Sequence, residues 1–283
     1  MKLSVPDIVA FHERVTSFYY ESGRHEMAWR QPGRGGKLDP YKILVSELML
    51  QQTQVARVEP KYAEFMAQFP NVQSLAAAPL AAVLKAWSGL GYNRRAKYLW
   101  EAARVIHAEH KDQFPKTYDA LVALPGIGPN TAGAMLAYAF DQPVVYLETN
   151  IRTVLIHHFF GDKQGVADAE LRAVLEQLVP GSSDVTDAAL SPRQFYWALM
   201  DYGSFLKKSV GNKNTASRSY TKQSAFHGSK RQVRGQVLRL LKNGPMPQVQ
   251  LQKEISDERL AQVLEDLMAE GLLNRTGTRY RLG

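Results

Sequence analysis

The feature that most constrains the fold is a repeated helix signal, with almost no strand alternation, over residues 1–205. Apolar residues recur there at helical spacing, and short connections containing proline separate the segments. Asp39-Pro40 has the residue types of a helix cap followed by a first helical residue. The helices that we predict span residues 41–58, 61–68, 72–77, 80–88, 92–109, 117–123, 130–140, 148–159, 168–178 and 193–205. Because no fixed period relates them, the pattern predicts a mainly α globule and no solenoid.

The chain changes character after residue 202. From Tyr202 to Lys253 it contains eleven Lys or Arg residues and no Asp or Glu. We predict a basic linker over 206–229, which is either a solvated tether or a segment that neutralises phosphates.

Residues 230–283 predict a helix, a short helix, a longer helix and a basic hairpin turning near Thr276-Gly277. This order predicts a winged-helix-like α+β module, with Arg275, Arg279 and Arg281 on its hairpin. Such modules bind DNA or proteins, and both alternatives stay open here.

The segment Leu124-Pro-Gly-Ile-Gly-Pro-Asn-Thr131 lies between two predicted helices. Gly126 and Gly128 permit a tight turn and close approach of the backbone. The first amides of the following helix have no intrahelical partner and lie at the positive end of the helix dipole. The segment therefore predicts an anion site of the kind that holds a phosphate.

Composition excludes several classes of function. The 283 residues carry a formal net charge of +8, which suits a polyanion but also any cationic protein. The sequence has no cysteine, which excludes disulfides, thiolate catalysis and thiolate-bound zinc or iron–sulfur clusters. The seven histidines have no metal-ligand spacing, so we expect no metal. No apolar run approaches the ~20 residues of a membrane span, and we expect a cytoplasmic protein with no membrane partner.

Further segments occur in a characteristic order: Ala28-Trp29-Arg30, residues 39–54 (DPYKILVSELMLQQTQ), 89–92 (GLGY) followed by Arg94 and Arg95, and 147–152 (LETNIR). Together with the hairpin they resemble the helix-hairpin-helix (HhH-GPD) DNA glycosylases. They are most similar to the MutY-type adenine glycosylases, with endonuclease III as the sister group. The resemblance covers residues 15–205 and is lost from Gly211.

The resemblance implies a two-lobed helical fold. One lobe would comprise residues 1–32 and 146–205, and the other residues 33–145 with the hairpin at 117–140. The linker over 206–229 and the module over 230–283 would follow.

The resemblance also implies the catalytic groups. Glu47, in the motif SELML, would donate a proton to the departing purine, and Glu148 would stabilise the sugar cation. Glu47 lies in an apolar run, where desolvation would raise its pKa and keep it protonated. Asn150 would orient Glu148 by a hydrogen bond. Without the motif, Glu47 with Gln51 would be an ordinary polar helix stripe, and Glu148 a charge that suits a helix N-terminus.

The same resemblance implies a set of residues that contact DNA or the substrate. Gln52 would fill the gap left by the extruded nucleotide, and Tyr92 would lie near the opposite strand. A solvent-facing glutamine and a half-buried tyrosine are the simpler alternatives for these two. The full set is Trp29, Arg30, Gln51, Gln52, Tyr92, Arg94, Arg95, Gly126, Gly128, Asn130, Thr131, Arg152, Arg275 and Arg279.

This chain departs from the family pattern at four places. Asn130 replaces the lysine that forms a Schiff base in the endonuclease III branch, so we expect no β-lyase activity. Glu148 stands where the adenine glycosylases commonly have Asp. The four cysteines that bind the family's iron–sulfur cluster are missing at 207–220, so we expect no cofactor. The C-terminal domain that recognises 8-oxoguanine is replaced by residues 230–283.

These observations favour a monofunctional DNA glycosylase of base excision repair, acting on a flipped mismatched base, with adenine preferred. A glycosylase for uracil or another modified base is an alternative. A non-catalytic protein that binds particular DNA structures is an alternative of a different class. In each case we expect a monomer whose partner is DNA, as a duplex with a mismatch or a damaged base.

Overall fold

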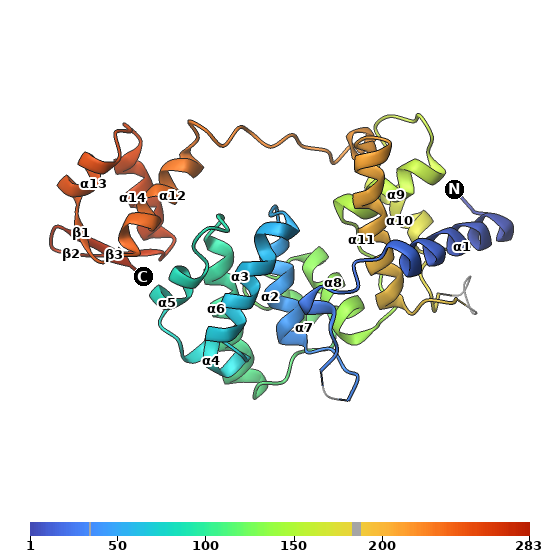
Figure 1. Ribbon diagram of the computed structural model, residues 1–283, viewed down its shortest axis with the longest axis horizontal. Coiled ribbons are helices and arrows are strands. Elements are labelled where there is room, and N and C mark those ends of the chain that lie inside the picture. The colour runs from blue at the N-terminus through green and yellow to red at the C-terminus, as the bar shows by residue number, and fades with distance from the viewer. Residues whose placement is uncertain (34, 183–187) are drawn as a thin grey trace. The chain divides into compact units, whose positions relative to one another are not determined.

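The structure is a computed structural model that describes residues 1–33, 35–182 and 188–283 (Figure 1). Its helices are α1 (Val5–Ser22), η1 (Ala28–Arg30), α2 (Pro40–Leu50), α3 (Val55–Gln68), α4 (Val72–Ala77), α5 (Leu80–Ala86), α6 (Arg94–His110), α7 (Tyr118–Val122), α8 (Pro129–Phe140), α9 (Thr149–Phe159), α10 (Asp168–Leu175), α11 (Pro192–Ser209), η2 (Lys213–Ala216), α12 (Lys230–Leu241), α13 (Gln248–Glu254) and α14 (Leu260–Ala269). Its strands are β1 (Met246–Pro247), β2 (Leu273–Thr276) and β3 (Arg279–Leu282). The mainly helical fold class is thus confirmed.

Local sequence signals located most helices to within a few residues, but two predictions were wrong. The predicted helix over 41–58 is interrupted after Leu50, because Gln52 adopts a left-handed conformation with φ 53°. The helix that follows starts at Val55 and continues through Pro60, where a boundary was expected. Helix α1 was not predicted, although Ser4 and Asp7 form a complete capping box at its start.

The chain forms two compact units, which we describe separately. The first, unit 1, comprises residues 1–43, 115–123 and 127–222, and the second, unit 2, comprises residues 44–114, 124–126 and 223–283. This division differs from the predicted lobes. Residues 33–43, α7 and α8 belong to unit 1 with the N-terminal segment, and the C-terminal module belongs with α3–α6 in unit 2.

Unit 1 is organised around α11, which packs against α1, α8 and α9. Helix α8 is buried along residues 131–139, because its Ala and Gly residues let neighbouring elements approach closely. Helix α11 contributes Phe195, Tyr196 and Leu199 to the same core. Burial of these large side chains is the main source of stability for unit 1.

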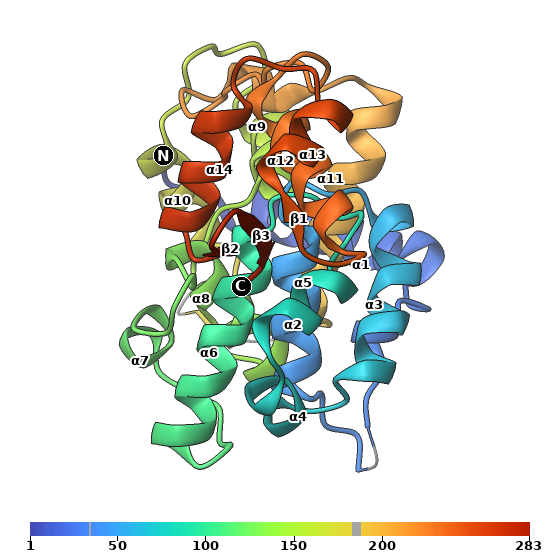
Figure 2. The ribbon, with the colours of Figure 1, turned by 90° about the vertical axis from the view of Figure 1, so that its left-hand side faces the viewer.

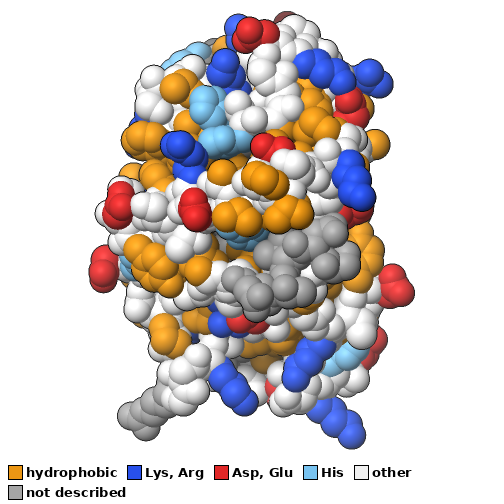
Figure 3. Space-filling view, turned by 90° about the vertical axis from the view of Figure 1, so that its right-hand side faces the viewer, with side chains coloured by type: hydrophobic (Ala, Val, Ile, Leu, Met, Phe, Trp, Pro, Cys, Tyr) orange, Lys and Arg blue, Asp and Glu red, His pale blue; other side chains and the backbone are white. Residues whose placement is uncertain are grey.

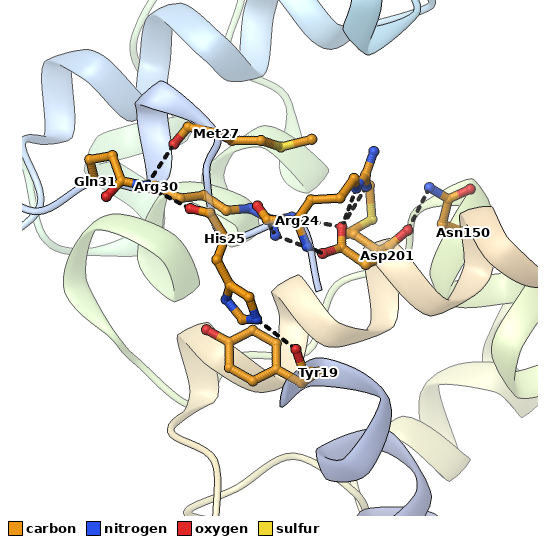
Figure 4. A network of polar contacts seen from close by, with 9 residues as sticks. Tyr19, Arg24, His25, Met27, Arg30, Gln31, Asn150 and Asp201 are labelled. Atoms are coloured by element: carbon orange, nitrogen blue, oxygen red, sulfur yellow. Dashed lines mark hydrogen bonds and ion pairs between the residues drawn. The ribbon is translucent and has the colours of Figure 1, made fainter. Parts of the chain in front are cut away.

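One carboxylate joins the N-terminal segment to α11 in unit 1 (Figure 4). Asp201 is almost fully buried and accepts two hydrogen bonds from Arg30, at 2.7 and 2.9 Å. Arg24 adds one from its Nε at 2.7 Å and one from its backbone N–H at 2.8 Å. Burial alone would raise the pKa of Asp201, but the hydrogen bonds and charges of the two arginines outweigh it and lower the pKa.

The first half of the predicted linker is ordered structure, which corrects that prediction. Helix α11 extends to Ser209, and η2 packs against α9. Val166 donates its N–H to Ala216 and accepts from the N–H of Arg218, both at 2.9 Å. Residues 206–218 are therefore part of unit 1.

Unit 2 joins α3–α6 to the C-terminal module. Helix α6 packs against α4 and α5, and α12 packs against α14. The module contains a three-stranded antiparallel sheet in the order β1-β3-β2. Its hairpin turns at Gly277, as predicted, with Leu273 opposite Leu282. Strand β3 lies next to α5 (Figure 2), while the winged-helix assignment stays a prediction. In the described ranges, no helix is both long enough and apolar enough to cross a bilayer.

The buried ion pairs of Asp201 give a test of stability. Asp201→Asn leaves Arg30 buried without a counter-charge, and we expect the free energy of unfolding to fall by about 3–5 kcal/mol. Because the pKa of Asp201 is lowered, this contribution is present at neutral pH and is lost as the pH falls through that lowered pKa. Urea unfolding of both proteins at pH 7 measures the difference. Asp257→Asn, which removes an exposed ion pair with Arg259, is the control; equal losses in the two variants would contradict the argument.

Candidate active site

The predicted hairpin consists of α7, a turn and α8. Its two glycines, Gly126 and Gly128, have different surroundings. Gly126 has φ +72°, and a Cβ there would lie 2.3 Å from the Cβ of Tyr98. Gly128 is the N-cap of α8, and a Cβ there would meet no atom within 4 Å. No side chain caps α8, and its first residue is Pro129. The start of α8 therefore has the uncapped amides of an anion site.

Two hairpin residues on the predicted contact list lie in the first turn of α8. Asn130 is half-buried, and Thr131 is buried at 8% exposure. Their contribution to an anion site would come from the backbone at the helix start rather than from long side chains.

Glu47 lies in the third turn of α2, in unit 2. It is half-buried, and the residues on both sides of it, Ser46 and Leu48, are buried. Helix α2 therefore holds this carboxyl group partly out of water, as the sequence predicted.

Glu148 is the N-cap residue of α9, in unit 1, with an extended backbone. Burial raises the pKa of Glu148, and the charge of Arg152 opposes part of that rise. Burial thus favours the neutral acid at this position, and the Arg152 charge favours the carboxylate that could stabilise a nearby cation.

Asn150 has a different partner from the one predicted. Its amide donates to the backbone carbonyl of Met200 at 3.1 Å and not to Glu148 (Figure 4). Helix α11 approaches α9 here because residue 203 is glycine; a Cβ at Gly203 would lie 2.3 Å from the carbonyl oxygen of Asn150. Asn150 therefore anchors the start of α9 to α11, next to Asp201.

Three residues predicted to contact DNA are structural within unit 1. Trp29 is buried at 4% exposure, and Arg30 is bound to Asp201. Arg152 makes a two-point ion pair with Asp168, at 3.0 and 2.7 Å. Burial of Trp29 and the ion pairs of Arg30 and Arg152 therefore give these three side chains structural roles. The sequence motif does not show these partners.

Arg95 is also structural, and this corrects its prediction as a phosphate contact. Its guanidinium is buried and donates to the backbone carbonyls of Leu48 at 2.7 Å, Met49 at 3.0 Å and Gln51 at 2.5 Å, at the end of α2. It also donates to the carbonyls of Leu90 at 3.2 Å and Gly91 at 3.1 Å. Burial lowers the pKa of Arg95 to about 10, so it remains a cation at neutral pH. One side chain thus fixes the 51–54 turn and the 89–92 loop together.

Gln52 and Tyr92 lie in the two loops that Arg95 holds. Both are exposed, and both have left-handed backbones, with φ 53° and 47°. Such conformations are unfavourable for residues other than glycine and are retained where the surrounding structure enforces them. The two positions predicted to contact the base stack are therefore held, exposed, by the same buried cation.

The other predicted contacts lie at surfaces of unit 2. Arg94 has 58% of its side chain exposed and lies 3.8 Å from Glu270. Gln51, at the end of α2, is half-buried. Arg275 and Arg279 are exposed on β2 and β3, as predicted, and Arg275 also lies over the ring of Tyr280.

The sequence matches the HhH-GPD superfamily of base excision DNA repair proteins over residues 45–180. An adenine DNA glycosylase from Mycolicibacterium smegmatis is 33% identical over 280 residues, covering 91% of each chain. The adenine DNA glycosylase of Mycobacterium tuberculosis is 31% identical over 278 residues, 91% of this chain and 88% of that protein. The chain belongs to the HhH-GPD superfamily.

Two solved structures share the fold. A thermostable thymine-DNA glycosylase matches 70% of this chain and 87% of its own, with a TM-score of 0.57 and 24% identity. A non-covalent endonuclease III–DNA complex matches 72% of this chain and 86% of that chain, with a TM-score of 0.53 and 17% identity. The predicted end of the resemblance near residue 205 was too early, because a match over 91% of the chain extends beyond it.

The iron–sulfur cluster implied by the MutY resemblance does not fit this HhH-GPD chain, because the sequence has no cysteine to bind it. The segment concerned, 207–220, is instead held by the backbone bonds to Val166 and by packing of η2 on α9. Within the described ranges, no group of His, Asp and Glu is arranged to hold a metal ion.

The site residues that the sequence did not predict are Asp201, Gln223 and Arg231. Asp201 had a local signal, because it is the one charged residue in the apolar run FYWALMDYGSFL. Gln223 and Arg231 had no such local signal. On the face shown in Figure 3, basic, acidic and apolar side chains of the described residues are interspersed, so the net positive charge is not gathered there.

Arg94 and Arg95 are a matched pair for testing these assignments. Arg95→Ala leaves the carbonyls at the end of α2 without their donor, and we expect the free energy of unfolding to fall by about 3 kcal/mol. Arg94→Ala removes an exposed cation and should leave the free energy of unfolding unchanged. It should weaken binding to duplex DNA and lower the slope of log K for binding against log salt concentration by about 1. Urea unfolding and fluorescence anisotropy at several salt concentrations measure both. A stable Arg95→Ala protein would refute the structural role.

Proposed function

We propose that this chain is a monofunctional DNA glycosylase that excises adenine from mismatched duplex DNA. The observation that carries the proposal is the similarity, over 91% of both chains, to an adenine DNA glycosylase. The family motif places Glu47 at the position of the acid that protonates the purine. Similarity to complexes of endonuclease III with DNA supports duplex DNA as the partner.

In the proposed reaction, Glu47 transfers its proton to N7 of the flipped adenine. The bond from the sugar C1′ to N9 breaks, and its electron pair leaves with the base. The cation that develops on the sugar is stabilised by the carboxylate of Glu148. Water then adds to C1′ and gives its proton to the carboxylate of Glu47, which restores the acid and leaves an abasic site and free adenine.

Asn130 supports the assignment as monofunctional. A Schiff base at C1′ requires an amine, and an asparagine amide at this position of the hairpin cannot supply one. The abasic site would therefore keep an intact strand until alkali cleaves it.

Two substitutions test the chemistry. Glu47→Gln and Glu148→Gln should each lower the single-turnover excision rate by about 10²–10⁴, with duplex binding retained. Glu59→Gln, on the exposed face of α3, is the control. The substrates are duplexes with A opposite 8-oxoguanine or G, and with U or T opposite G, treated with alkali and resolved on a gel.

The outcomes separate the three functions considered. Excision of A supports the proposal, whereas activity on uracil alone would contradict it. Binding without strand scission on any substrate would identify a non-catalytic DNA-binding protein. Scission without alkali would contradict the monofunctional assignment.

The shifted pKa of Glu148 gives a prediction for pH dependence. Because burial raises this pKa above the ordinary value of 4.5, a step that needs ionised Glu148 should lose rate as the pH falls, beginning above the range of an ordinary glutamate. Arg152→Gln removes the charge that lowers this pKa, so the acid limb should move to higher pH. Asp168→Asn breaks the ion pair between Arg152 and Asp168 but keeps the Arg152 charge, so the acid limb should not move to higher pH. Single-turnover rates from pH 4 to 8 measure this; identical limbs in wild type and Arg152→Gln would argue against it.

A further inference from the structure

A large cavity in unit 2 has a wall that the family motif does not include. Its volume is about 1250 Å³, and it is lined by residues 51–57, by the 88–95 loop, and by residues of the segment 223–239. The first two regions contain Gln52 and Tyr92. The third comprises the end of the predicted linker and the start of the C-terminal module, and it begins 128 residues (223 − 95) after the 88–95 loop.

The charge of the cavity is strongly positive. Six arginines and one acidic residue, Glu270, are among the described residues that line it. The arginines are Arg57, Arg94, Arg95, Arg231, Arg234 and Arg239. Glutamine and asparagine side chains make up much of the remaining wall. Guanidinium groups with amides are the side chains that bind phosphates and the edges of bases.

Two residues of the segment 223–239 contact Gln52 and Tyr92 directly. Arg231 donates from Nη1 to the hydroxyl of Tyr92 at 2.5 Å, and its guanidinium lies 5.7 Å from the centre of that ring. Gln223 donates to Oε1 of Gln52 at 3.0 Å and also to the hydroxyl of Tyr92. The residues predicted to contact the base stack therefore share polar contacts with this second element.

An exposed aromatic residue completes this wall. Phe226 lines the cavity and has 54% of its surface exposed. Arg231 donates from Nη2 to the carbonyl of Ser224 at 2.6 Å, which holds the turn that carries Phe226. Aromatic rings beside a cationic groove are platforms on which unpaired bases stack.

We propose that the segment 223–231 recognises the base opposite the excised one, and that Arg231 sets the preference for that base. This inference rests on the proposed glycosylase function. When DNA enters the cavity, the guanidinium of Arg231 releases the hydroxyl of Tyr92 and binds the base opposite the excised one. A guanidinium matches two adjacent acceptors, and guanine presents O6 and N7 on one edge. The segment therefore favours a guanine-type base, and Phe226 stacks on an unpaired neighbour.

The test measures discrimination rather than activity alone. The readout is the single-turnover excision rate for A opposite G divided by that for A opposite C, at saturating enzyme. We expect wild type to prefer G, and Arg231→Ala to lower the ratio by about 5- to 100-fold. Arg231→Lys keeps the charge but lacks the fork, so the ratio should fall similarly while the salt dependence of binding stays at the wild-type value.

Two further variants act as controls. Lys242→Ala removes an exposed cation at the end of α12, outside the cavity lining, and should leave the ratio unchanged. Phe226→Ala should weaken binding to all duplexes by about 5- to 100-fold, whatever the opposite base. Thermal unfolding of each variant checks that the fold is intact.

The outcomes distinguish this inference from the proposed function. An active wild type with no preference for G, or an unchanged ratio in Arg231→Ala, overturns the inference alone. If wild type excises no base, the proposed function fails. The same ratio is then taken from dissociation constants for duplexes that carry an abasic-site analogue opposite G or C, and a ratio that Arg231→Ala leaves unchanged overturns the inference there as well.

Discussion

The arrangement of unit 2 depends on one buried cation, Arg95. The last carbonyls of any helix lack intrahelical partners, and those of α2 end among buried side chains. Arg95 supplies donors to them and to the 89–92 loop at once. The two loops share one guanidinium, and each contains a residue in a left-handed conformation, Gln52 or Tyr92. The positions predicted to contact the base stack are therefore set by a residue whose own donors bind backbone carbonyls.

In unit 1, a buried anion rather than a buried cation connects separate segments of the chain. Asp201 is buried on α11 and gathers Arg24 and Arg30 from the N-terminal segment. The carbonyl of the preceding residue, Met200, accepts the amide of Asn150 at the start of α9. The start of α9, where Glu148 lies, is thus tied to the same stretch of α11 that holds the N-terminal segment. Removing one partner from such a group would leave an uncompensated buried charge, so the group favours the arrangement in which these segments meet.

The two glutamates have different surroundings, and this bears on their proposed roles. Glu47 lies within α2, half-buried between the buried residues Ser46 and Leu48. Glu148 lies at a helix start, where the dipole favours a negative charge, and Arg152 partly offsets the effect of burial on its pKa. Hydrolysis of a glycosidic bond uses one carboxyl group as the acid and another to stabilise the sugar cation. The proposed mechanism assigns the roles in that order.

By itself, the sequence determined the features that depend on residues close together along the chain. Caps, prolines and helical spacing located most helices, and a contiguous motif identified the hairpin and Glu47. It could not separate Arg94 from Arg95, because neighbours on a helix point about 100° apart and only packing decides which one is buried. It could not predict the contacts of Arg231 with Tyr92 or of Arg30 with Asp201, which join residues 139 and 171 positions apart. Those contacts form only when the folded backbone brings distant side chains within hydrogen-bond distance, and no local pattern encodes that distance.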